Sequence, residues 1–123
     1  MASIDTHLVR KQLKAIAASS KAVKKLLYDA LERLEENPSQ FPALDECPED
    51  LLREYPDATL RKVYIERDPH SFRLVIIHWV FPDEDGEDEG GEEHVDVIYA
   101  FPRKRGYSID WEWVAEFMNE STS

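Results

Sequence analysis

Three short stretches of this chain place basic residues close to aromatic ones. The side chains in them that are best suited to catalysis or ligand binding are Lys62, Arg73, Arg103, Arg105 and Tyr107. Guanidinium and ammonium groups bind phosphate oxygens through charge-assisted hydrogen bonds. The basic run at residues 103–105 therefore has two interpretations: contact with phosphate, or a solvated strand end that keeps a sheet edge from aggregating.

Arg73 and Tyr107 also have structural interpretations. An arginine near aromatic residues can be held in a buried ion pair, here with Asp96 or with an acidic residue of a connecting segment. Tyr107 can be a packing aromatic as readily as a proton donor. The sequence leaves these alternatives open.

Other chemically competent groups show weaker patterns. His78, His94 and Asp96 fall on adjacent predicted strands, but their spacing matches no strong metal-ligand signature, so we expect neither a metal nor another cofactor. Cys47 stands in acidic surroundings, which raise a thiol pKa and argue against a nucleophilic role. A lone cysteine and the lack of a signal peptide indicate the cytoplasm.

The charge of the chain is strongly acidic but unevenly distributed. The formal net charge is -11, which argues against indiscriminate binding of nucleic acid. Eight acidic residues lie within residues 82–93, so the remainder carries only -11 + 8 = -3. A local basic face is therefore compatible with the composition. No apolar run approaches the roughly 20 residues that a membrane span needs.

Apolar spacing predicts the helices that precede the strands. Val9, Leu13 and Ile16 indicate a short first helix that begins near residues 5–6. Ser20 can cap a second helix with a wide apolar stripe, and Asn37 before Pro38 ends it. Within the connection between this helix and the strands, residues 38–59, residues 48–55 could form one or two helical turns with Leu51 and Leu52 directed inward.

β-rich runs at residues 60–65, 72–81 and 94–101 predict an antiparallel meander. The acidic residues 82–93 form a mobile hairpin loop in this interpretation, and Asp110 caps a final helix. The expected fold is α+β: an N-terminal helical hairpin packed on a small antiparallel β-sheet with a C-terminal helix, in one domain of residues 1–123.

Alternation along residues 72–81 decides which side chains share a face of the sheet. Phe72, Leu74, Ile76 and Val80 form one side with His78, and Arg73 lies on the other with Val75, Ile77, Trp79 and Phe81. The second side is too apolar to remain in water. We expect the C-terminal helix to cover it, in preference to a partner protein or a second copy.

Three motifs occur in a fixed order: Leu60-Arg61-Lys62-Val63, Ser71-Phe72-Arg73-Leu74-Val75-Ile76, and Pro102-Arg103-Lys104-Arg105-Gly106-Tyr107. This order resembles the RelE/ParE toxin superfamily over residues 7 to about 107. There, a helical hairpin precedes a strand that begins with Leu-Arg-Lys, a strand that opens with aromatic-Arg-Leu-Val, and a strand that ends in a basic cluster followed by Tyr.

The resemblance implies the toxin of a bacterial type II toxin–antitoxin module, with an antitoxin as partner. Its activity would be metal-independent cleavage of mRNA on the ribosome. Lys62, Arg73, and Arg103 or Arg105 would stabilise charge on the phosphate, and Tyr107 would help to move protons. The alternative on this scaffold is a non-catalytic binding protein, either an inhibitor of DNA gyrase or a member without toxicity.

The chain departs from the family pattern in its acidic charge, in a shorter Arg-to-Tyr spacing near the end, and in two features of the strands. Tyr64 stands where some of the ribonucleases have a second lysine on the first strand of the meander. Residues 1–6 are too short and too polar to form the strand that precedes the first helix in the family. The sequence therefore predicts a sheet that is one strand short.

Overall fold

The computed structural model describes residues 2–67, 70–81, 92–103 and 108–122. The chain has an α+β fold. Its elements in chain order are β1 (Ser3–Asp5), the 3₁₀ helix η1 (His7–Val9), α1 (Arg10–Ala18), α2 (Lys21–Glu36), the 3₁₀ helix η2 (Pro38–Gln40), α3 (Glu49–Glu54), β2 (Ala58–Arg67), β3 (His70–Phe81), β4 (Glu92–Pro102) and α4 (Trp111–Thr122).

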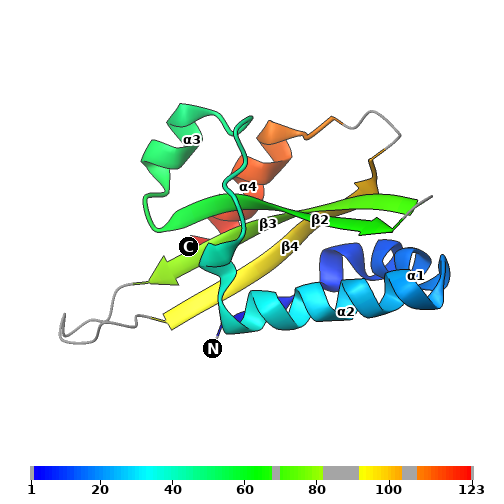
Figure 1. Ribbon diagram of the computed structural model, residues 1–123. Helices are drawn as coiled ribbons and strands as arrows, with labels where there is room; N and C mark the ends of the chain where they lie inside the picture. Colours follow the sequence, from blue (N-terminus) through cyan, green and yellow to red (C-terminus); the bar gives the residue numbers. More distant parts are fainter. Residues whose placement is uncertain (1, 68–69, 82–91, 104–107, 123) are drawn as a thin grey trace.

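These elements form three layers, with a four-stranded sheet in the middle (Figure 1). The strand order is β1-β4-β3-β2, and β2, β3 and β4 pair antiparallel as the sequence predicts. Helices α1 and α2 lie on one face of the sheet, while α3 and α4 lie on the other. Because helices cover both faces, β3 can be buried on both sides.

The prediction that residues 1–6 form no strand is wrong. Residues Ser3–Asp5 form β1, which pairs in parallel with β4 so that Ile4 lies opposite Val95. Ala2 is buried, and its amide donates to the carbonyl of Glu35 at 2.8 Å. Strand pairing uses backbone groups, so an edge strand can form from a short, polar segment once a partner strand is available. The sheet is therefore mixed.

Helix α2 forms for the local reasons that its sequence indicates. The hydroxyl of Ser20 accepts from the amide of Val23 at 3.0 Å and so caps the first turn. Val23, Leu27, Ala30 and Leu34 are buried in one stripe along the helix. The helix ends at Asn37, before the proline that begins η2. The first helix, by contrast, begins through η1 without a side-chain cap.

The two faces of β3 belong to two separate apolar cores. The core under α1 and α2 includes Phe72, Leu74 and Ile76, together with Val23, Leu27 and Leu34 of α2. The core under α4 includes Val75, Ile77 and Trp79, together with Leu44 and Leu51 from the segment after η2 and Val114 and Met118 of α4. The expectation that the C-terminal helix covers the face that Arg73 shares is confirmed.

A β-bulge in β4 adds a buried side chain to the core under α4. The register with β3 shifts between Val75 and Ile76, where Val75 lies opposite Tyr99 and Ile76 lies opposite Val97. The extra residue, Ile98, is buried against α4, and its neighbour Tyr99 packs against the same core. This β-bulge lets two consecutive side chains reach one face of the sheet.

Three expectations about individual positions need correction. Val80 is 41% exposed and Leu52 is 38% exposed, so neither belongs to the core that its spacing suggested. Val80 is the second-last residue of β3. Glu92 and Glu93 begin β4 and are therefore not loop residues. The rest of the acidic segment, residues 82–91, lies outside the described residues.

Replacing Met118 by alanine should test the cover that α4 provides. Met118 is fully buried under the sheet, so Met118→Ala leaves a cavity and should lower the free energy of unfolding by about 2–5 kcal/mol. Asn119→Ala, one residue further along on the exposed side, is the matched control and should change it by less than about 0.5 kcal/mol. Urea unfolding measures both. Equal stability of the two variants would show that α4 does not pack on the sheet.

Candidate functional site

Strand pairing gathers three of the five predicted site residues around one tyrosine. Tyr64 of β2 lies directly opposite Arg73 of β3, so the two side chains share a face of the sheet. Lys62 lies two residues before Tyr64 on β2 and points to the same face. Arg103 follows β4, and its amide donates to the carbonyl of Ser71 at 2.9 Å, which fixes it beside the start of β3.

All three cations lie near the ring of Tyr64. The distance from the ring centroid is 4.4 Å to Cζ of Arg103, 5.6 Å to Cζ of Arg73 and 5.9 Å to Nζ of Lys62. The electron-rich faces of an aromatic ring attract cations at such distances. We call this group, Lys62, Tyr64, Arg73 and Arg103, the Tyr64 cluster. Tyr64 is thus the residue that all three cations share.

Each cation of the Tyr64 cluster also faces a carboxylate. Lys62 Nζ lies 3.8 Å from Asp45 Oδ2, Arg73 Nη2 donates to Glu46 Oε1 at 3.3 Å, and Arg103 Nη1 pairs with Glu66 Oε1. Three cations and three carboxylates leave this group of residues formally neutral. Binding of an anion here therefore requires that carboxylates move away.

The three ion pairs differ in how readily they can open. The side chains of Asp45 and Glu66 are 89% and 55% exposed, and exposed ion pairs are each worth at most about 1 kcal/mol. A phosphate that brings two or more negative oxygens can displace them. The Arg73 side chain is 7% exposed, and burying its charge is costly without a paired carboxylate. The Arg73–Glu46 pair therefore opens least readily. Lys62 and Arg103, whose own side chains are 20% and 43% exposed, are thus the cations whose ion pairs can open.

Arg73 forms a buried ion pair with an acidic residue of a connecting segment, which is one of the two structural interpretations of this residue. Glu46, between η2 and α3, is its partner, whereas Asp96 is engaged elsewhere. The remaining predicted site residues, Arg105 and Tyr107, lie outside the described residues. The structure therefore brings Lys62, Arg73 and Arg103 together and leaves the positions of the other two as predictions.

His78 belongs to a different network, on the face that α1 and α2 cover. Arg61 Nε donates to His78 Nδ1 at 3.1 Å, and His78 Nε2 lies 3.0 Å from Glu93 Oε1. Because a guanidinium can only donate, Nδ1 is the acceptor and Nε2 carries the proton toward the carboxylate. Burial lowers the pKa of Arg61, and Glu93 opposes that shift. This buried network satisfies its own members.

His94 and Asp96 lie on the opposite face from His78, so the three residues do not meet. Asp96 is buried, and its two oxygens accept from Trp79 Nε1 at 3.0 Å and contact His94 Nε2 at 2.9 Å. The other ring nitrogen of His94 lies 2.6 Å from the hydroxyl of Ser3. This chain of hydrogen bonds links β1 to β4, and we interpret it as the side-chain contact that holds the edge strand in place.

Cys47 is buried, and burial raises the pKa of its thiol. The expectation of a raised pKa is therefore met, but the cause is desolvation by the core under α4 and not the acidic surroundings. A protonated thiol in an apolar core is a packing residue.

Sequence reasoning missed the residues that organise the Tyr64 cluster. Tyr64 was noted only as a departure from a family pattern, and its carboxylate neighbours Asp45, Glu46 and Glu66 were not singled out. Strand alternation offered one usable signal, since Lys62 and Tyr64 are two residues apart. The partners from residues 45 and 46 are distant in sequence and gave none.

Comparison with protein-family models, with curated proteins and with solved structures gives no match to this chain. Among the helices of the described residues, none is both long enough and apolar enough to cross a membrane. The function must therefore be argued from the site itself.

Removing the guanidinium of Arg73 should destabilise the protein, because the side chain is buried beside the core under α4 and pairs with Glu46. We expect Arg73→Ala to lower the free energy of unfolding by about 2 kcal/mol or more. Arg103→Ala removes a half-exposed cation of the same cluster and should cost less than about 1 kcal/mol. Urea denaturation compares the two. An Arg73→Ala protein as stable as the parent would contradict a structural role.

Proposed function

We propose that this chain is the toxin-like component of a type II toxin–antitoxin module and acts as a metal-independent endoribonuclease on ribosome-bound mRNA. The observation that carries the proposal is the convergence of Lys62, Arg73 and Arg103 on Tyr64. Attack by a ribose 2′-hydroxyl builds negative charge on the phosphate oxygens, and cations that are already in place stabilise that charge.

The geometry suggests a division of labour among these residues. Lys62 and Arg103 would contact the phosphate after displacing their exposed carboxylates, Asp45 and Glu66. Arg73, paired with Glu46, would add no net charge and would hold one side of the Tyr64 ring. Tyr64 would position all three through its ring. Proton transfer would fall to Tyr107, as the family resemblance implies.

The order of elements also supports a RelE/ParE-like arrangement. Two helices precede the antiparallel strands, and the basic segment follows the last strand at Arg103. β1 stands before the first helix, where the family has its first strand, so the apparent lack of that strand no longer counts against the resemblance.

The alternative is a non-catalytic binding protein on the same scaffold, such as an inhibitor of DNA gyrase. The observation that favours it is the neutralisation of all three cations by carboxylates. A site selected for phosphoryl transfer gains from unpaired cations, whereas a protein-binding surface tolerates ion pairs at its rim.

Lys62→Ala and Arg103→Ala should each lower cleavage by roughly 10²- to 10³-fold, because each removes a cation that stabilises charge in the transition state. The measurement is cleavage of a defined mRNA on purified ribosomes, with the products mapped by primer extension. Lys11→Ala removes a cation on α1, away from the cluster, and should leave the rate unchanged.

Tyr64 separates positioning from proton transfer in the same assay. Tyr64→Phe keeps the ring and should keep most of the activity, while Tyr64→Ala should lose it. Activity that is lost in both variants would assign the phenol hydroxyl a direct role. A parent protein that leaves mRNA intact but inhibits DNA supercoiling by gyrase would establish the alternative function.

A further inference from the structure

The first two helices carry a concentration of positive charge that contrasts with the rest of the chain. Residues 6–28 contain six cations and no acidic residue, in a protein whose net charge is -11. The six are Arg10, Lys11, Lys14, Lys21, Lys24 and Lys25. Within the described part of the chain, none of them lies within 4 Å of a carboxylate, unlike the cations of the Tyr64 cluster.

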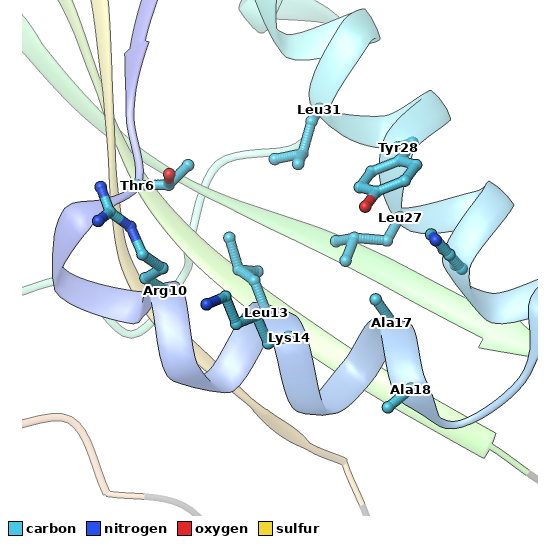
Figure 2. Close-up of a pocket in the computed structure, with 10 residues that line it drawn as sticks. Thr6, Arg10, Leu13, Lys14, Ala17, Ala18, Leu27, Tyr28 and Leu31 are labelled. Carbon is cyan, nitrogen blue, oxygen red and sulfur yellow. The ribbon is translucent and has the colours of Figure 1, made fainter.

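A groove with an apolar floor runs between α1 and α2 among these cations (Figure 2). Its volume is about 440 Å³, and Leu13 and Ala17 of α1 face Leu27 and Leu31 of α2 across it. Leu27 is buried, but Leu13, Ala17 and Leu31 are partly exposed, and Tyr28 is 55% exposed. The groove therefore leaves apolar surface accessible to a ligand.

Cations stand on both sides of this floor. Arg10 and Lys14 belong to α1, and Lys24 belongs to α2, where its Nζ lies 5.7 Å from the ring centroid of Tyr28. All three are exposed. A complementary ligand must offer apolar groups to the floor and negative charge to both edges.

We propose that this groove between α1 and α2 binds an acidic amphipathic helix of a partner protein. Such a helix presents apolar side chains at positions i, i+3, i+4 and i+7 on one face and carboxylates on its flanks. Its apolar side chains fit between Leu13 and Leu31, and its carboxylates meet Arg10, Lys14 and Lys24. Opposite charges bordering an apolar groove provide both selectivity and fast association.

Other anionic partners match the groove less well. A nucleic-acid backbone has no apolar groups for the floor, and its affinity would come from the cations alone. A bilayer is bound by apolar side chains that protrude into it, whereas here the apolar floor is recessed between two helices. The α1 and α2 face lies on the other side of the sheet from α4, so this inference does not depend on the proposed ribonuclease activity.

Binding of designed peptides to the full-length protein tests the proposal by isothermal titration calorimetry. The probe is a helical peptide with leucines at i, i+3, i+4 and i+7 and glutamates on both flanks of that leucine stripe. Two controls keep its length: one replaces each glutamate by lysine, and the other keeps the composition but scrambles the leucine spacing. We expect binding of the probe only, with affinity that falls as salt is raised.

Matched variants locate the binding to the groove. Lys14→Glu reverses a charge at its edge and should weaken binding at least about tenfold, whereas Lys11→Glu makes the same change in charge outside the groove and should have a much smaller effect. Ala17→Phe fills the floor and should also block binding, with circular dichroism showing that the helices remain.

Three outcomes would overturn the proposal. The first is absence of probe binding, and the second is equal binding of the scrambled peptide. The third is preferential binding of a single-stranded RNA oligonucleotide or of phosphatidylglycerol vesicles that depends on Lys14, which would assign the surface to nucleic acid or to membrane lipid.

Discussion

The central strand β3 has apolar side chains on both of its faces, and this constraint determines the rest of the architecture. Leu74 and Ile76 face one way and Val75 and Ile77 the other, and all four are fully buried. Neither face can remain in water, so each must carry its own layer. Helices α1 and α2 provide one layer, and α4 provides the other together with the segment around Leu44 and Leu51.

The same burial of both faces of β3 determines the surroundings of Arg73. It follows the alternation of β3 and is therefore directed into the layer beneath α4, where a lone guanidinium would be costly to bury. Glu46 offsets that cost from the segment that also closes the core under α4. The ring of Tyr64, across the strand pair, brings Lys62 and Arg103 to the same place. The candidate site thus lies at Arg73, where the row of apolar side chains on the α4 face of β3 ends.

The two charged surfaces of the molecule differ in a way that bears on their roles. Cations in the Tyr64 cluster are matched by carboxylates, so an anion could bind there only by displacing a carboxylate. Cations on α1 and α2 have no carboxylate within 4 Å among the described residues, and they border accessible apolar surface. The first surface suits a phosphate that competes with carboxylates. The second suits a partner that supplies apolar contacts and charge together.

The sequence by itself determined the elements whose signals are local. Ser20 and Asp110 cap the helices that they were expected to cap, and the apolar stripe of α2 is buried as its spacing predicts. Alternation along β3 correctly separated Arg73 from Leu74, and the C-terminal helix covers the Arg73 face as expected. Capping and periodicity depend on neighbours within a few residues, which a sequence displays directly.

Only the tertiary structure decided the contacts between residues that are distant in the chain. β1 forms because its backbone pairs with β4, and no property of residues 1–6 predicts that pairing. Glu46 meets Arg73 across 27 positions, and Arg103 meets Glu66 across 37. Such pairs arise from strand register and from the path of a connecting segment. Single residue types and short spacings carry no record of either, so the partners of the candidate site emerged only when the chain was folded.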